Sequence, residues 1–180
     1  MKHVLIITSS LRGRSNSDLL AAAFAKGARE AGCEVETISL KGKRLAFCTG
    51  CLACQKTGQC VIADDAQTIA EQVKAADVLV FASPVYYYSV AGSLKTLLDR
   101  LNPLFAGDYS FRDVYFLSAA AEDSEEAEEG PKTAVQGWVD CFENARLAGT
   151  VFAGGFGDAG SAAGSDAEKK AYELGLSIGA

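Results

Sequence analysis

Apolar residues follow two alternating patterns along the chain. Short, nearly continuous apolar runs are typical of strands covered on both faces of a parallel sheet. They predict strands at His3 to Thr8, Glu34 to Ser39, Val78 to Ala82, Asp113 to Ser118 and Thr150 to Ala153. Between and after these runs, apolar residues repeat every three or four positions, which indicates helices. The repeats are Leu20, Phe24, Ala28 and Ala31; Ile69, Val73 and Ala76; Leu94, Leu97, Leu98 and Leu101; Val135, Trp138, Val139 and Phe142; and a last helix from about Asp166 to Leu176, capped by Ser165.

Strict alternation of strand and helix predicts the α/β class. We expect a three-layer, doubly wound sheet of five parallel strands with helices on both faces. Residues 1–180 contain no internal repeat or linker, so we expect a single domain. Three segments interrupt the pattern. They are a cysteine-rich loop, 47–60, after the second strand; an acidic run, 122–129, expected to be solvated; and a Gly- and Ala-rich loop, 154–164, expected to be mobile.

The composition of the chain excludes some classes of binding partner. Hydrophobic residues make up 49% of the chain, which is enough for a packed core, and the net charge is −6. An acidic protein lacks the basic surface that a nucleic-acid backbone requires. The apolar run Val4 to Ile7 is too short for a secretion signal, and no apolar stretch approaches the roughly 18 residues of a membrane-spanning helix. We therefore expect a cytoplasmic protein that binds neither nucleic acid nor membrane.

The loop after the first strand, Thr8 to Ser17, offers hydroxyls, an amide, two arginines and the free N–H groups of a starting helix. Ligands of open α/β sheets lie outside the carboxyl ends of the strands, and a helix N-terminus there is an anion site. The loop lacks both the G-x-G-x-x-G motif and the Walker A lysine, which favours a monophosphate over a pyrophosphate. An ordinary helix entry capped by Ser15 or Ser17 is the alternative.

The third predicted strand is followed by three consecutive tyrosines, Tyr86 to Tyr88. A planar ring system could stack on this segment or lie against its backbone. The alternative is an aromatic patch that joins two subunits. Both interpretations are compatible with one loop.

Two motifs resemble those of the NADPH-dependent FMN reductases. The first is Ser9-Ser10-Leu11-Arg12 with Ser15-Asn16-Ser17, in which Ser9 stands where the family usually has glycine. The second is Ser83-Pro84-Val85-Tyr86 with Leu94-Lys95 and Asp99-Arg100. The resemblance implies a flavodoxin-like fold, FMN as cofactor and NAD(P)H as electron donor. It further implies that the FMN phosphate is held by Ser10, Arg12, Ser15, Asn16 and Ser17, that the isoalloxazine ring is lined by Pro84, Val85, Tyr86 and Tyr87, and that the loop from Ser118 to Ala121 completes the site.

Four cysteines follow the second strand in the pattern Cys48-x2-Cys51-x2-Cys54-x5-Cys60. Four closely spaced thiolates can hold a 4Fe-4S cluster. The alternatives are structural zinc and reduced cysteines that hold no metal, including a thiol pair used for redox chemistry. The run resembles that of the iron-sulfur flavoproteins, which are related to the FMN reductases and carry a cluster near the flavin. Cys33 and Cys141 are predicted to be small buried hydrophobes.

These features predict an FMN-binding oxidoreductase of the NAD(P)H-dependent flavin or quinone reductase type. Reduced nicotinamide or a protein delivers electrons, and a small molecule or a protein accepts them, with no catalytic side-chain acid or base required. The alternative is a non-enzymatic electron carrier that relays electrons between proteins. A cofactor-free binding module is a third hypothesis. The resemblance also implies a homodimer or higher homo-oligomer.

Overall fold

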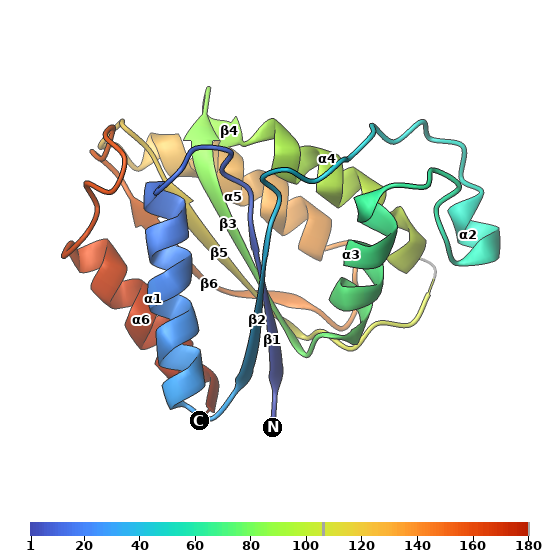
Figure 1. Cartoon of the computed structure of the whole chain (residues 1–180), viewed down its shortest axis with the longest axis horizontal. Helices are drawn as coiled ribbons and strands as arrows, with labels where there is room; N and C mark the ends of the chain where they lie inside the picture. Colours follow the sequence, from blue (N-terminus) through green and yellow to red (C-terminus); the bar gives the residue numbers. More distant parts are fainter. Residues whose placement is uncertain (106, 180) are drawn as a thin grey trace.

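A central twisted sheet with helices on both sides organises the chain (Figure 1), for which a computed structural model describes residues 1–105 and 107–179. The sheet order is β2-β1-β3-β5-β6, with all neighbours on this path parallel. The strands are β1 (His3–Thr8), β2 (Glu34–Ser39), β3 (Val78–Tyr86), β5 (Asp113–Ala119) and β6 (Arg146–Ala153), and the short β4 (Ser89–Val90) pairs with β3.

Two separate cores lie on the two faces of this sheet. One is formed with α1 (Asn16–Glu30) and α6 (Asp166–Leu176). The other is formed with α3 (Asp65–Ala75), α4 (Gly92–Arg100) and α5 (Glu126–Val139). The remaining short helices are α2 (Cys54–Thr57), the 3-10 turn η1 (Asn102–Leu104) and the 3-10 turn η2 (Ser177–Gly179). The predicted three-layer doubly wound architecture is therefore confirmed, and its strand order is that of flavodoxin-like sheets.

The third strand differs from the sequence prediction. It continues past Ala82 to Tyr86 and turns back into β4 as an antiparallel hairpin, with Val85 opposite Val90. Tyr87 and Tyr88 form the turn, with φ angles of 48° and 56°. Positive φ at both central residues is the conformation of a type I′ hairpin turn, whose twist matches that of the flanking strands. Tyrosine rarely adopts this conformation. Helix α5 packs on the turn, since a Cβ at Gly130 would lie 1.9 Å from the carbonyl oxygen of Tyr88.

The sixth strand begins at Arg146 rather than Thr150, because this edge strand is only partly covered and its first half shows no apolar run. The acidic run is largely exposed, as predicted, and its second half is the first turn of α5, where carboxylates face the positive end of the helix dipole.

Cys33 is buried as predicted, but the prediction for Cys141 was wrong, since it lies exposed just after α5. Within the described part of the chain, no helix is both long and apolar enough to cross a membrane.

Close packing of α1 on α6 fixes the direction in which α1 leaves the sheet edge. A Cβ at Gly27 would lie 2.1 Å from the carbonyl oxygen of Tyr172, and a Cβ at Gly175 would lie 2.1 Å from that of Phe24. Both neighbours are backbone atoms, which cannot move aside as a flexible side chain can. The two glycines therefore set the spacing of the two helices.

This contact predicts a strong effect of a single methyl group. Gly175→Ala should lower the free energy of unfolding by about 3 kcal/mol, because the helices must separate. Gly137→Ala in α5 is the matched control: beyond the adjoining backbone of its own helix, no described atom lies within 4 Å of its added Cβ, so better helix propensity should raise stability by about 0.5 to 1 kcal/mol. Urea denaturation of both variants measures the difference. Equal effects in the two variants would contradict this account of the packing.

Candidate flavin site

The loop after β1 and the hairpin after β3 lie side by side because their strands are neighbours. The parallel register pairs Thr8 with Ala82. One residue further on, the backbone N–H and the hydroxyl of Ser9 both donate to the carbonyl oxygen of Ala82, at 2.9 and 3.0 Å. From α4, the hydroxyl of Ser93 donates to the carbonyl oxygen of Ser9 at 2.7 Å. Ser9 is fully buried, so its hydroxyl, absent where the family has glycine, is accommodated by a specific partner.

The N-terminus of α1 opens onto this loop. Ser15 is the N-cap, and its hydroxyl accepts a hydrogen bond from the backbone N–H of Asp18 at 3.1 Å. The hydroxyl of Ser10 accepts from the backbone N–H of Arg12 at 3.2 Å. The interpretation of Ser15 as a helix cap is therefore confirmed, but it does not exclude an anion site. The same helix end also presents free N–H groups and a positive dipole toward the loop.

Both loops line one hollow of about 570 Å³, a volume that includes space open to solvent. All the predicted cofactor-binding residues except Tyr87 and Ser118 contribute to its lining, which consists of Ser10, Arg12, Ser15, Asn16, Ser17, Pro84, Val85, Tyr86, Ala119, Ala120, Ala121, Phe156 and Gly157. One end carries hydroxyls and a guanidinium, and the other is largely apolar.

The structure places the two remaining predicted residues elsewhere. Tyr87 occupies the tip of the hairpin turn, and its side chain is fully exposed. Ser118 is fully buried, and its hydroxyl has no hydrogen-bond partner among the described residues. Successive residues of a strand face opposite sides of the sheet, so the lining begins one residue later, at Ala119.

Sequence reasoning missed the segment after β6, which supplies Phe156 and Gly157 to the hollow. Hydrogen bonds tie this segment to the first loop: Arg12 Nη1 donates to the carbonyl oxygen of Gly157 at 2.9 Å. Asn16 makes further bonds to the same segment. The expectation of a mobile loop at 154–164 did not include these hydrogen bonds and stays a prediction. Its position after the last strand, at the carboxyl edge of the sheet, is the signal that could have identified it.

The cysteine-rich loop is closed at its base by Arg100, the last residue of α4. Its guanidinium donates to the carbonyl oxygens of Ala46 and Ile62, at 2.8 and 3.1 Å, which lie just before and just after the loop. It also forms a two-pronged pair with the carboxylate of Asp64, at 2.7 and 2.8 Å. The side chain of Arg100 is 0% exposed and that of Asp64 is 7% exposed, so this pair is buried.

Charge pairing outweighs burial at Asp64. Burial alone raises the pKa of its carboxyl group, but hydrogen bonds from Arg100 and from the backbone N–H groups of Ala46 and Ala66 lower that pKa below its usual value. The hydrogen bonds to Asp64 in turn raise the pKa of Arg100. Both groups are therefore charged at neutral pH, and each compensates the other.

All four cysteines of the motif line a second, smaller hollow, together with Arg100 and Asn102. Asn102 Nδ2 donates to Cys54 Sγ at 3.2 Å, and the backbone N–H of Gly50 donates to Cys48 Sγ at 3.4 Å. Hydrogen bonds from Ala53 and Thr49 lower the pKa of the exposed Cys51 thiol. Among the residues that the structure describes, however, no three ligating side chains are close enough to share a metal ion. The predicted metal ligands are neighbours, but they are not assembled into a metal site.

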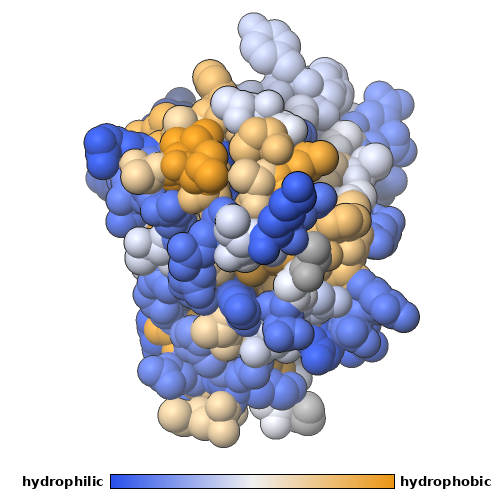
Figure 2. All heavy atoms as spheres, turned by 90° about the vertical axis from the view of Figure 1, so that its right-hand side faces the viewer, coloured by the Kyte–Doolittle hydropathy of each residue, from blue (hydrophilic) through white to orange (hydrophobic). Residues whose placement is uncertain are grey.

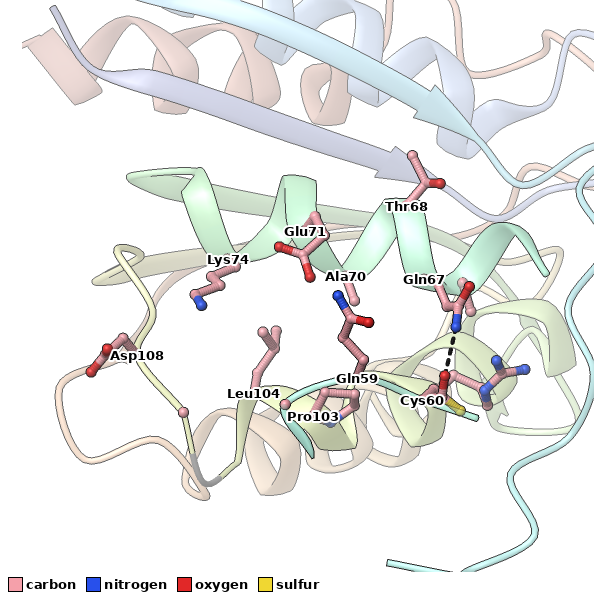
Figure 3. A pocket seen from close by; sticks show the side chains of 14 residues that line it. Gln59, Cys60, Gln67, Thr68, Ala70, Glu71, Lys74, Pro103, Leu104 and Asp108 are labelled. Atoms are coloured by element: carbon pink, nitrogen blue, oxygen red, sulfur yellow. Dashed lines mark hydrogen bonds between the residues drawn. The ribbon is translucent and has the colours of Figure 1, made fainter. Parts of the chain in front are cut away.

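The surface around the cysteines is partly apolar. The cysteine-rich loop and the residue that follows it contribute the exposed side chains of Phe47, Leu52 and Val61. Figure 2 views the molecule from the side on which this loop lies and shows hydrophobic atoms gathered toward the upper part of that face. Cys60 also borders another hollow, between α3 and η1, into which Gln59, Lys74 and Leu104 point (Figure 3). This hollow contains none of the residues predicted to bind FMN.

The Asp64–Arg100 pair predicts a pH-dependent stability. Because the pKa of Asp64 is lowered in the folded state, its contribution is fully present above the unfolded pKa of about 3.9 and is lost as pH falls through the folded value. Asp64→Asn should therefore cost about 3 kcal/mol of unfolding free energy at pH 7 and much less at pH 3. Urea unfolding at both pH values measures this. Asp113→Asn, in the exposed pair with Arg146, is the control and should change little; an equal loss for Asp64→Asn at both pH values would contradict the prediction.

The chain resembles several proteins in sequence. An iron-sulfur flavoprotein of Archaeoglobus fulgidus is 31% identical over 183 residues, which covers 99% of this chain and 79% of that protein. An iron-sulfur flavoprotein of Methanocaldococcus jannaschii is 40% identical over 104 residues, which covers 58% of this chain and 54% of that protein. The match to the second relative thus spans about half of its length.

Solved structures with low sequence identity share the fold. An NAD(P)H:quinone oxidoreductase from Methanothermobacter marburgensis superimposes with a TM-score of 0.69 and 18% identity, covering 98% of this chain and 96% of that one. An FMN-dependent NADH-azoreductase from Bacillus anthracis, solved in complex with FMN, gives a TM-score of 0.70 and 15% identity, covering 98% and 97%.

The family assignment rests on a match to a family as a whole. Residues 2–143 match the family described as NADPH-dependent FMN reductase. That span contains the phosphate-loop motif, the hairpin motif and the four clustered cysteines. The resemblance recognised in the sequence is confirmed, and the chain belongs to the NADPH-dependent FMN reductase family.

Proposed function

We propose that this protein binds FMN in the hollow between the β1 loop and the β3–β4 hairpin and uses it as an NAD(P)H-dependent oxidoreductase of the flavin or quinone reductase type. One observation carries the proposal. Two loops that resemble a phosphate-binding and a ring-binding motif line the same hollow, although they lie far apart in sequence. That hollow lies where β1 meets β3, the point at which strand order reverses and mononucleotides bind in this class of sheet.

The lining has the donors that a flavin mononucleotide requires. At one end, the hydroxyls of Ser10, Ser15 and Ser17 and the guanidinium of Arg12 accompany the N-terminus of α1. These groups suit a phosphate, because they combine hydrogen-bond donors with positive charge. At the other end, Tyr86 and the 119–121 segment form an apolar, open wall that suits a flat ring system.

FMN, when bound, supplies the electron-transfer chemistry. The residues of the chain would bind and orient it, and Ser9, Ser83 and Ser93 hold the two loops in place. Ser83 has a direct role here, since its hydroxyl accepts from the backbone N–H of Ala91 at 3.0 Å and donates to the carbonyl oxygen of Pro84 at 2.9 Å. The hairpin is thereby fixed beside the hollow. No acid or base from the chain is required for electron transfer.

A non-enzymatic electron carrier is the second candidate. It is favoured by the names of the relatives, which are iron-sulfur flavoproteins, and by the cysteines lining one hollow. Steady oxidation of NADPH in the presence of free flavin or a quinone supports the reductase. Bound FMN with no turnover of reduced nicotinamide supports the carrier. A cytoplasmic location and a homodimer remain predictions, to be tested by fractionation and by light scattering.

We further propose that Cys48, Cys51, Cys54 and Cys60 hold a 4Fe-4S cluster once the loop between Ala46 and Ile62 tightens. Three observations support the cluster. The four cysteines line one hollow, and N–H donors point at the sulfurs of Cys48 and Cys54. In addition, the buried Nε of Arg100 has no partner among the described residues. An unpartnered buried donor is costly, and an anionic group nearby would satisfy it. Because the described thiols are not assembled, no step of electron transfer is derived through the cluster.

The phosphate site predicts a difference between two arginines of one loop. Arg12 lines the hollow, whereas Arg14 does not. Arg12→Gln should weaken FMN binding at least tenfold, because a charge-assisted hydrogen bond contributes about 1.5 to 3 kcal/mol. Arg14→Gln removes the same charge from the neighbouring surface and should change affinity little. Fluorescence titration of the flavin-free protein measures both, and equal losses would show a general effect of charge rather than a phosphate contact.

The cluster proposal is tested on protein purified without oxygen. The visible spectrum should show flavin and iron-sulfur absorption together, with about four iron and four sulfide per chain. Cys54→Ser should remove the iron, whereas Cys141→Ser, at an exposed cysteine outside the motif, should not. Zinc without sulfide would establish the structural zinc alternative, and protein free of both would leave the cysteines as thiols. Absence of flavin that FMN cannot restore would refute the proposed function itself.

A further inference from the structure

Asn16 lies at the start of α1, inside the phosphate-loop motif, and only 7% of it is exposed. Its side-chain Nδ2 donates to the carbonyl oxygens of Phe156 and Asp158, both at 2.9 Å. Its Oδ1 accepts from the backbone N–H of Ala162 at 3.1 Å. A single side chain thus holds three points of the segment that follows β6.

This arrangement leaves no donor for a phosphate. A primary amide has two N–H hydrogens, and both are engaged with carbonyl oxygens. The orientation of the amide is fixed, because its oxygen faces an N–H and its nitrogen faces two acceptors. A phosphate could gain nothing from Oδ1, which is itself an acceptor. The side chain of Asn16 therefore has a different role from the phosphate ligand that the resemblance implies, although its backbone N–H stays at the helix N-terminus.

The segment that Asn16 holds forms part of the hollow. Phe156 lines the hollow and packs against the core on the α1 side of the sheet. Its backbone N–H donates to the carbonyl oxygen of Ala120 at 2.9 Å, so the segment bridges two other walls of the same site. Ala162, the last residue held by Asn16, is fully buried. Gly160 within the segment, and Gly155 and Gly164 on either side of it, have positive φ, so its path depends on tethers rather than on regular structure.

We propose that Asn16 is a positioning residue: it fastens the 156–162 segment to the phosphate loop and so holds Phe156 as a wall against the flavin. The proposal rests on the proposed function. On this proposal Asn16 contributes to binding of the ring and ribityl chain through Phe156, and its side chain does not contact the phosphate. Riboflavin, which has the ring and ribityl chain but no phosphate, separates these two roles.

The experiment measures dissociation constants of FMN and riboflavin for the wild type, Asn16→Ala, Phe156→Ala and the double variant. Asn16→Ala should weaken both ligands by a similar factor of about ten, since three buried hydrogen bonds of modest net value are lost. In the Phe156→Ala background, Asn16→Ala should cause little further loss, because the wall it positions is already gone. A loss of affinity confined to FMN would make Asn16 a phosphate ligand and overturn the proposal. Full additivity of the two substitutions would also overturn it, and so would unchanged affinities for both ligands.

A second measurement needs no cofactor. Amide hydrogen exchange in the flavin-free protein should show faster exchange at Ala162 in Asn16→Ala, with the Leu20 to Ala28 amides of α1 unchanged. Asn16→Ser serves if the alanine variant fails to fold. Unchanged protection at Ala162 overturns the tether. If the wild type binds neither FMN nor riboflavin, the proposed function is refuted, and so is the role of Phe156 as a wall against the flavin. The hydrogen-exchange result still decides whether Asn16 holds the 156–162 segment.

Discussion

The parallel ladder between β1 and β3 is the constraint on which the candidate site depends. It brings the ends of two strands to one point at the sheet edge, where Ser9 bonds twice to the carbonyl oxygen of Ala82. From there one chain turns into the N-terminus of α1 and the other into the tyrosine hairpin. Because the strands are fixed by continuous hydrogen bonding, the hydroxyl-rich loop and the apolar hairpin keep one relative position. A hollow with a polar end and an apolar end is the direct result.

Each wall of that hollow is held by a different kind of contact. Helix α1 is set by its close approach to α6 at two glycines, the hairpin by Gly130 of α5 beneath Tyr88, and the 156–162 segment by the amide of Asn16. These contacts come from parts of the chain that lack any local relation to one another. The geometry of the site therefore depends on both layers of helices, and a substitution that shifts a helix in either layer should change it.

The cysteine-rich loop is anchored independently of this site. Arg100 joins its two ends to Asp64 in a buried pair, and the loop projects from the edge of the molecule beside α3 and α4 (Figure 1). A buried ion pair is a poor source of net stability, but loss of one partner leaves an uncompensated charge. The pair thus fixes where the loop begins and ends.

The sequence by itself determined the fold class, the family and most of the residues that line the hollow. These depend on local signals: the period of the apolar residues, the Ser15 cap and two short motifs whose spacing is set by one loop each. Only the tertiary structure decided the extension of β3 into a hairpin, the displacement of Tyr87 and Ser118 from the lining, and the use of Asn16 as a tether for Phe156. The Asn16 tether joins residues 140 positions apart, and the hairpin turn packs against Gly130 of α5. A local pattern carries no record of which side chain meets which backbone atom.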